Sequence, residues 1–217
     1  MKQIQRWFFI LTNPWVIVMY WSLVVISYFY LDKPLALYLH SLNLHAKFPV
    51  LSWITQLGSA IIYIIVLLVL ALICRFIIHN KKAERYFWFL WLCVFIANLV
   101  GSVFKTILGR ARPEELINHQ QFGFTGWHFG QDAFSSFPSG HVTVVTSLLV
   151  GLTVLFPRYC YVFLTTTVIV MLTRVLLTRH YLSDVLATFY LVFIGLNLLF
   201  YLVRRYYPKM WSFIPNE

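Results

Sequence analysis

A chain of 217 residues with 60% hydrophobic, 19% aromatic and 11% charged residues is too apolar for an ordinary soluble domain. The net charge of +10 is divided into short basic clusters between apolar runs, which argues against a nucleic-acid-binding face and is typical of loops that orient membrane helices. The cysteines Cys74, Cys93 and Cys160 fall inside apolar runs without metal-type spacing, so we expect buried thiols and no disulfide framework.

Long charge-free runs recur along the chain, each close to the roughly 20 residues that a helix needs to cross a hydrocarbon core of about 30 Å. The first run is expected to be a retained span and not a cleaved signal peptide, because it carries Trp15, Tyr20 and Trp21 and no small-residue cleavage site follows. The sequence predicts an all-α, polytopic membrane bundle with six transmembrane helices, at residues 14–31, 59–78, 86–108, 139–156, 159–177 and 183–203.

Residues 32–58 are apolar but interrupted by His40, His45, Lys47 and Pro49, which favours helices lying at the membrane interface. A span in this segment would invert the topology of everything after it. We find no internal repeat and no linker, and residues 1–217 are therefore expected to form a single domain.

Basic residues in the loops predict the orientation. With six spans both termini share a side, and that side carries ten Lys and Arg residues against seven on the other. This bias predicts cytoplasmic termini. Five of the seven opposite charges crowd at the ends of the third, fifth and sixth spans, where topology alone does not require them.

The stretch Phe137-Pro138-Ser139-Gly140-His141 leads directly into a charge-free run, as a loop does when it becomes the first turn of a helix. Free N–H groups and the positive end of the helix dipole at such a start favour an anion. Ser139 adds a hydroxyl, Gly140 permits close approach to the backbone, and His141 titrates near neutrality. A helix cap followed by an inert histidine would give the same pattern.

Charged residues elsewhere fall on the same predicted face as His141. Lys105 ends the third span, Arg112 follows seven residues later, and Arg174 lies near the end of the fifth span. Singly, these residues fit a snorkelling lysine and solvated arginines. Together they form a cationic rim suited to a phosphate.

His180 and Asp184 are four residues apart, so they share a face if this turn is helical. A carboxylate on one ring nitrogen fixes the tautomer and leaves the other nitrogen free as a nucleophile or base. Alternatively, Asp184 stabilises the N-terminus of the sixth span.

Three motifs now stand in order: Lys105-x6-Arg112-Pro113, Pro138-Ser139-Gly140-His141, and Arg174-x5-His180-x3-Asp184. They resemble the signature of the type 2 phosphatidic acid phosphatase superfamily, which includes membrane lipid phosphatases and vanadium haloperoxidases. The resemblance covers residues 105–184 and the six-span layout. One departure is Thr173, where the family usually has serine, and the hydroxyl is retained.

The resemblance implies the role of each motif residue. His180 would be the nucleophile that forms a phosphohistidine, Asp184 its orienting partner, and His141 the general acid. The implied phosphate ligands are Lys105, Arg112, Ser139, Gly140 and Arg174. Fixed cations and a helix N-terminus could stabilise phosphoryl transfer without a metal, so we expect no metal site and no cofactor.

The function expected from this resemblance is a phosphatase of the non-cytoplasmic leaflet, in a bacterial cytoplasmic membrane, that acts on a lipid phosphate or pyrophosphate. Polyprenyl pyrophosphate, phosphatidylglycerophosphate, phosphatidic acid and lipid A are the substrate classes. Membrane lipids are the expected partners, and nucleic acid is not. The alternatives are a lipid phosphotransferase with the same intermediate and a transporter that uses the rim as an anion site. The aromatic residues of loop 114–137 fit either interfacial anchors or a lipid-facing lip beside the site.

Overall fold

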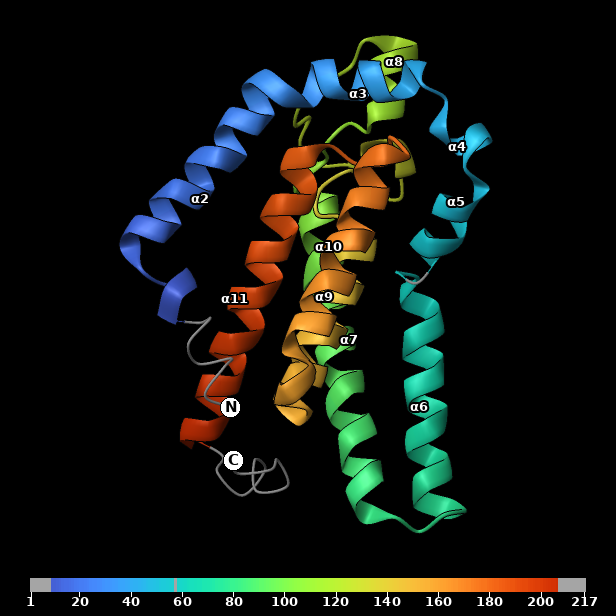
Figure 1. Cartoon of the computed structure of the whole chain (residues 1–217), viewed down its shortest axis with the longest axis vertical. Helices are drawn as coiled ribbons and strands as arrows, with labels where there is room; N and C mark the ends of the chain where they lie inside the picture. Colours follow the sequence, from blue (N-terminus) through green and yellow to red (C-terminus); the bar gives the residue numbers. More distant parts are fainter. Residues whose placement is uncertain (1–8, 57, 207–217) are drawn as a thin grey trace.

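The computed structural model describes residues 9–56 and 58–206, which are helical apart from loops and two isolated bridges, from Arg110 to Phe124 and to Ser135 (Figure 1). Short helices frame the loops: α4 (Leu44–Lys47), α5 (Pro49–Gln56), α8 (Pro113–His119), and the 3₁₀ turns η2 (Asp132–Phe134) and η3 (Pro157–Tyr159). The longer helices are α2 (Pro14–Ile26), α3 (Asp32–Ser41), α6 (Ala60–Phe76), α7 (Lys81–Leu108), α9 (Gly140–Leu155), α10 (Cys160–Leu176) and α11 (Leu182–Tyr206).

The first long helix is favoured at its start by Pro14 in the first turn and by the Asn13 side chain, which accepts a hydrogen bond from the Trp15 N–H. It does not end at residue 31, as the sequence predicted. A π-helical turn, η1 (Ser27–Leu31), connects α2 directly to α3, and α3 crosses the end of the bundle (Figure 1). Residues 32–41 therefore continue the first helix.

Helix α9 is the centre of the bundle, and 13 of its 16 residues are buried. It packs against α7, α10 and α11. Small residues let the helices approach closely: a Cβ on Gly151 would lie 3.0 Å from Leu90 Cδ2 and 3.3 Å from Cys93 Sγ of α7. The three cysteines are buried thiols, as expected.

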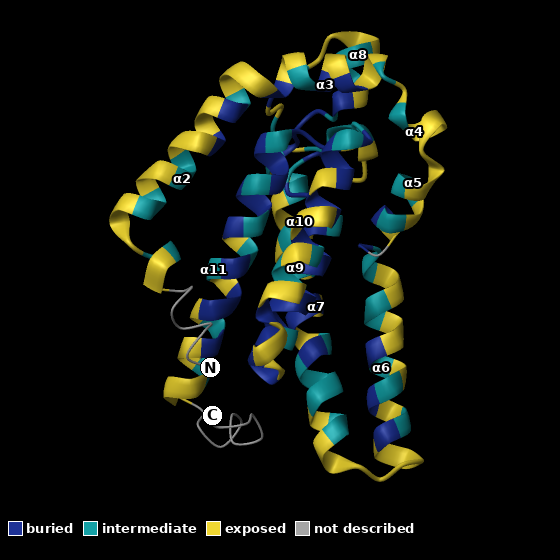
Figure 2. Ribbon diagram, in the orientation of Figure 1, coloured by how far each residue is buried: buried dark blue, intermediate teal, exposed yellow. Residues whose placement is uncertain are grey.

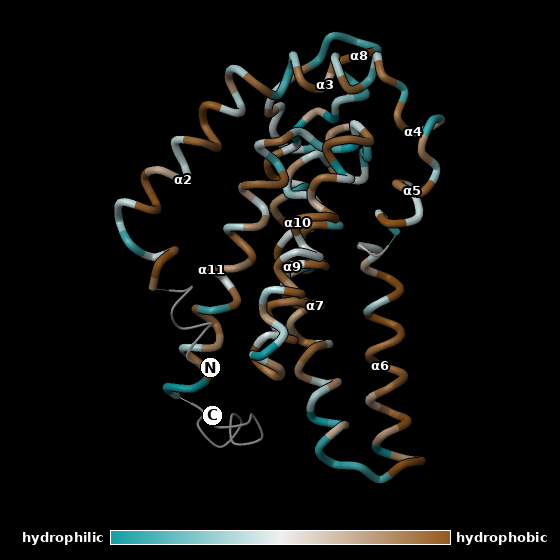
Figure 3. The backbone as a smooth tube through the Cα atoms, viewed as in Figure 1, coloured by the Kyte–Doolittle hydropathy of each residue, from teal (hydrophilic) through white to brown (hydrophobic). Residues whose placement is uncertain are grey.

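The outer helices expose apolar side chains. Much of α2 and α6 is exposed in Figure 2, and the same helices are largely hydrophobic in Figure 3. An apolar surface of this extent requires lipid around it. The chain is thus an all-α, multi-pass membrane protein.

The structure agrees with the positions of the predicted spans more closely than with their number. All six predicted segments are helical. Within residues 9–56 and 58–206, four helices are long and apolar enough to cross a membrane, and α5 with α6 makes a fifth if this pair, bent by 43°, is one span. Helix α9 is apolar but has only 16 residues. Six spans therefore remain a prediction.

Candidate active site

The charged residues lie at one end of the bundle, where α7 and α10 end and α9 and α11 begin (Figure 1). Long-range hydrogen bonds join these ends. Arg110, just after α7, donates to Ser183 Oγ of α11 at 2.8 Å, and the Ser139 N–H before α9 donates to Thr188 Oγ1 of α11 at 3.0 Å. The loop after α7 is therefore held against α11 and the start of α9.

Three of the five predicted phosphate ligands have buried polar atoms that find no hydrogen-bond partner in the described part of the chain: Ser139 Oγ, Arg112 Nε and Arg174 Nε. Burying such atoms without a partner is costly. Other atoms of the two arginines are held in place: Arg112 Nη2 donates to Asp132 and Ser135, and Arg174 Nη1 to Thr55 Oγ1 at 2.7 Å. The free atoms are therefore placed to receive an anion.

The other two predicted ligands meet at the start of α9. A Cβ on Gly140 would lie 3.3 Å from Lys105 Nζ, so the missing side chain lets the ammonium approach the helix N-terminus. Ser139 is the N-cap residue, but its side chain makes no capping bond. The first N–H groups of α9 therefore remain available to an anion beside a fixed positive charge.

His180 is buried in the loop between α10 and α11. Its Nδ1 lies 2.7 Å from the backbone carbonyl of Ser136. Because a carbonyl can only accept, Nδ1 carries the proton and Nε2 keeps a free lone pair. This is the tautomer that a nucleophilic Nε2 requires.

Asp184 lies close to His180, as the four-residue spacing predicted, but it does not hydrogen-bond the imidazole directly. His180 Nδ1 is 3.9 Å from Asp184 Oδ2, which is beyond hydrogen-bond distance. Asp184 instead accepts hydrogen bonds from Ser136 Oγ at 2.6 Å and from the Tyr181 N–H at 3.0 Å. Asp184 thus positions Ser136, whose carbonyl accepts the hydrogen bond from His180. Asp184 also accepts from the Tyr181 N–H just before α11, which agrees with the alternative interpretation that it stabilises this helix start.

Three positive charges act on both histidines of the site, His180 and His141. Burial, together with the positive charges of Arg174, Lys105 and Arg112, holds the pKa of His180 well below its usual range. The same three charges act on His141. His180 is therefore neutral at physiological pH, and one anion would face all three cations.

This electrostatic arrangement predicts a pH dependence. His180 loses its lone pair only when the pH falls below its lowered pKa, so the acid limb of kcat/KM due to His180 should lie below pH 6.5. Arg112→Gln removes a positive charge and should move this limb to higher pH. Profiles of both enzymes with one substrate measure the shift, because the substrate's ionisation is common to both. Arg158→Gln is the control, and a limb that stays in place or moves to lower pH contradicts the prediction.

His141, in the first turn of α9, has a close neighbour outside the motifs. A Cβ on Gly58 would lie 2.6 Å from His141 Cβ, so only glycine fits there. Since Thr55 of α5 also accepts a hydrogen bond from Arg174, Thr55 and Gly58 each lie against a site residue. From the sequence, both were expected only at the membrane interface. No motif marks them.

Arg110 and Asp32 were also missed as site residues. Arg110 is 1% exposed and forms ion pairs with both Asp32 and Asp184. Burial alone would lower the pKa of Arg110, but the carboxylates of Asp184 and Asp32 raise it above its ordinary value. One signal in the sequence was available: a carboxylate directly after the apolar run 14–31 is costly in a membrane unless it is paired.

The aromatic loop is divided between two roles. Phe122 and Phe124 pack on Tyr28 and lie over the Arg110 guanidinium, although Phe124 is partly exposed, whereas Trp127 and Phe129 are 70% and 81% exposed. His119 Nδ1 lies 3.0 Å from Glu115 Oε2, and His128 Nδ1 lies 3.2 Å from Gln131 Oε1.

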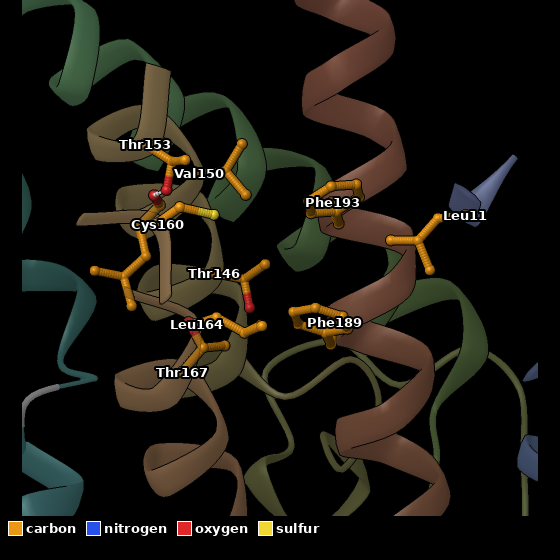
Figure 4. A pocket seen from close by; sticks show the side chains of 10 residues that line it. Leu11, Thr146, Val150, Thr153, Cys160, Leu164, Thr167, Phe189 and Phe193 are labelled. Atoms are coloured by element: carbon orange, nitrogen blue, oxygen red, sulfur yellow. Dashed lines mark hydrogen bonds between the residues drawn. The ribbon is translucent and has the colours of Figure 1, made fainter. Parts of the chain in front are cut away.

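Two apolar cavities lie between the helices, below the charged end. A cavity of about 170 Å³ is bounded by α9, α10 and α11, with Thr146, Leu164 and Phe193 among its lining residues (Figure 4). It contains none of the eight predicted site residues. The other, of about 420 Å³, lies between α7 and α11 and reaches Phe137 and Pro138 of the second motif.

A buried histidine among basic residues, at one end of a helical membrane bundle, defines the class of protein. Residues 86–208, more than half of the chain, match the sequence pattern of the PAP2 superfamily. The chain belongs to the PAP2 superfamily. This agrees with the resemblance seen in the motifs.

Relatives and a solved structure give a finer comparison. The chain is 38% identical over 99 residues to a lipid A 1-phosphatase of Rhizobium etli, covering 46% of this chain and 42% of that protein. It is 37% identical over 99 residues to a lipid A 1-phosphatase of Rhizobium johnstonii, covering 46% and 40%. The match thus spans about two fifths of these relatives. The crystal structure of a transmembrane PAP2-type phosphatidylglycerolphosphate phosphatase from Bacillus subtilis is similar with a TM-score of 0.44 and 16% identity, covering 95% of each chain.

Proposed function

We propose that this protein is a membrane lipid phosphatase that hydrolyses a phosphate monoester or pyrophosphate of a lipid through a phosphohistidine on His180. One observation carries the proposal: the buried imidazole has its Nδ1 held by a carbonyl, which leaves Nε2 free, and the charges of three cations act on it. At the same end of the bundle, three predicted ligands have buried polar atoms without a partner among the described residues. Among the substrate classes expected from the sequence, lipid A phosphate is the first to test, because two relatives are named for it.

The roles expected of these residues give the following chemistry. Nε2 of His180 attacks phosphorus, the bond to the leaving lipid oxygen breaks, and His141 gives that oxygen a proton. Water then attacks the phosphohistidine, His141 takes a proton from this water, and inorganic phosphate leaves. The five phosphate ligands stabilise charge on the equatorial oxygens in both steps. The negative charge of bound phosphate favours the protonated imidazole that His141 needs as an acid.

The cavity between α7 and α11 supports a lipid substrate. Its lining is apolar, it lies beside spans that face the bilayer, and it ends at the loop leading into α9. An acyl or prenyl chain there would place its phosphate near Ser139 and Gly140. Burying each additional methylene of that chain would contribute about 0.8 kcal/mol.

We expect Gly195→Phe to block this cavity. Gly195 of α11 lines it, and a Cβ at this position would meet no atom within 4 Å, so a ring can enter without displacing the helices. The KM for a long-chain lipid phosphate should rise about tenfold or more, equivalent to about 1.4 kcal/mol, while turnover of a water-soluble phosphate monoester stays within twofold. Steady-state kinetics in detergent micelles measures both.

Leu198→Phe is the matched control, because Leu198 is exposed on the same helix and does not line the cavity. If Gly195→Phe leaves the long-chain KM unchanged, or affects both substrates equally, the cavity does not hold the lipid chain.

Release of inorganic phosphate from a panel of lipid phosphates tests the proposed function. Lipid A 1-phosphate, phosphatidic acid, phosphatidylglycerophosphate and a polyprenyl pyrophosphate are offered with and without EDTA. We expect release from at least one lipid, unaffected by EDTA. An acceptor lipid is added in a parallel assay. Transfer of the phosphoryl group to that lipid, in place of its release as inorganic phosphate, would instead identify a phosphotransferase. No cleavage of any lipid would contradict the proposal.

A further inference from the structure

Asp32 is a buried carboxylate on a helix that is largely exposed. It is 1% exposed at the junction of η1 and α3, while Phe29, Tyr30 and Leu31 just before it are exposed. An ionised carboxylate at such a position costs several kcal/mol unless it is paired. Its contacts must therefore compensate for its burial.

Those contacts lead to α11. Asp32 Oδ1 accepts a hydrogen bond from the Ser183 N–H at 3.0 Å, and Oδ2 accepts from Ser183 Oγ and from Arg110 Nη2, the latter at 2.7 Å. Ser183 is in the first turn of α11, three residues after His180. Asp32 therefore caps the helix that follows the nucleophile, although 151 residues separate it from Ser183.

Arg110 extends the connection. Its Nη1 donates to Ser183 Oγ and to Asp184 Oδ1, so one guanidinium joins two carboxylates. Asp184 binds Ser136 Oγ, and the Ser136 carbonyl binds His180 Nδ1. All these residues are at most 3% exposed. A continuous buried chain of hydrogen bonds thus runs from the first helix to the imidazole.

The first helix also contacts the Arg110 guanidinium directly. The guanidinium carbon lies 4.9 Å from the ring centre of Tyr28, in the π-helical turn, and 4.7 Å from that of Tyr181, next to His180. Arginine gains from aromatic faces at such distances. Tyr28 and Asp32, both on the first helix, therefore restrict Arg110 together.

We propose that Asp32, on a helix outside residues 86–208, is a positioning residue for phosphoryl transfer. Through Ser183 and Arg110 it fixes the loop that carries His180 and the orientation of Asp184 and Ser136. This inference rests on the proposed function. Because Asp32 does not reach the phosphate, its loss should impair the attack by His180 more than the binding of substrate.

The test uses the full chain with Asp32→Asn, which keeps the side-chain shape and leaves Arg110 paired with Asp184. We expect kcat to fall tenfold or more while KM stays within twofold. Inhibition by vanadate, which adopts the five-coordinate geometry of the transferring phosphorus, should weaken about as much as kcat falls. Inhibition by inorganic phosphate should change by less than twofold. A purely structural role would lower the amount of folded enzyme without separating these constants.

Glu114→Gln is the control, because it removes an exposed carboxylate at the same end of the bundle. If Asp32→Asn does not fold, Ser183→Ala replaces it: this change removes one hydrogen bond to Asp32 and one from Arg110, and should lower kcat at least threefold with unchanged KM. A kcat within twofold of wild type in the folded variant overturns the inference. A wild-type enzyme that cleaves no lipid phosphate overturns the proposed function instead.

Discussion

His180→Ala should abolish phosphate release, with a loss of at least about a thousandfold, because the variant lacks the atom that we propose attacks phosphorus and the proposed ligands that remain cannot supply another nucleophile. The cavity left by the imidazole is small, and no charge is left unpaired, so the protein should still fold. Initial rates on the lipid that wild type cleaves best measure the effect, with thermal unfolding as the check on folding.

Substitutions among the phosphate ligands provide the comparison for this result. Arg174→Gln and Arg112→Gln should weaken binding and turnover but leave measurable activity, because other cations still face the phosphate. Retained turnover in His180→Ala, at the level of these variants or above, would show that another group attacks.

Arg110→Met should destabilise the protein by about 3–5 kcal/mol, the cost of removing one partner from a buried ion pair. The reason is the charge balance: Asp32 and Asp184 are both buried and share this one guanidinium. Without it, two carboxylates remain in a region of low dielectric. Thermal unfolding in detergent micelles should show a large fall in the midpoint.

Two further variants make this prediction specific. Arg110→Lys keeps a charge but loses the two-armed geometry, so its midpoint should lie between wild type and Arg110→Met. Arg179→Gln breaks an exposed pair with Glu114, 3.9 Å apart, and solvent screening should keep its effect below about 1 kcal/mol. An unchanged midpoint in Arg110→Met would mean that the carboxylates do not depend on Arg110.

The motif residues could be placed from the sequence because each motif lies at the end of a predicted helix and its internal spacing is short. A helix that ends soon after Lys105 and another that begins at Gly140 bring both residues to one membrane face, whatever the details of packing. The same reasoning located Arg174 and His180. Hydrophobic runs also located the six helical segments, since a membrane span leaves a strong compositional signal.

The contacts that hold the motif residues in place could not be predicted in the same way. Asp32 reaches Arg110 across 78 residues, and no periodicity connects the two positions. The partner of His180 is a backbone carbonyl, which any residue at position 136 could provide, so side-chain chemistry pointed to Asp184 instead. The extension of the first helix to Ser41 was missed because His40, His45 and Pro49 suggested an interrupted segment, although the π-helical turn keeps the helix continuous.

Trapping the covalent intermediate tests the central claim most directly. Enzyme mixed with lipid labelled with ³²P in the cleavable phosphate, and quenched within milliseconds, should carry label on the peptide that contains His180. This label should be stable in base and lost in acid, as a phosphorus–nitrogen bond requires, and absent from His180→Ala. Label that survives acid, or that lies on another residue, would contradict the account.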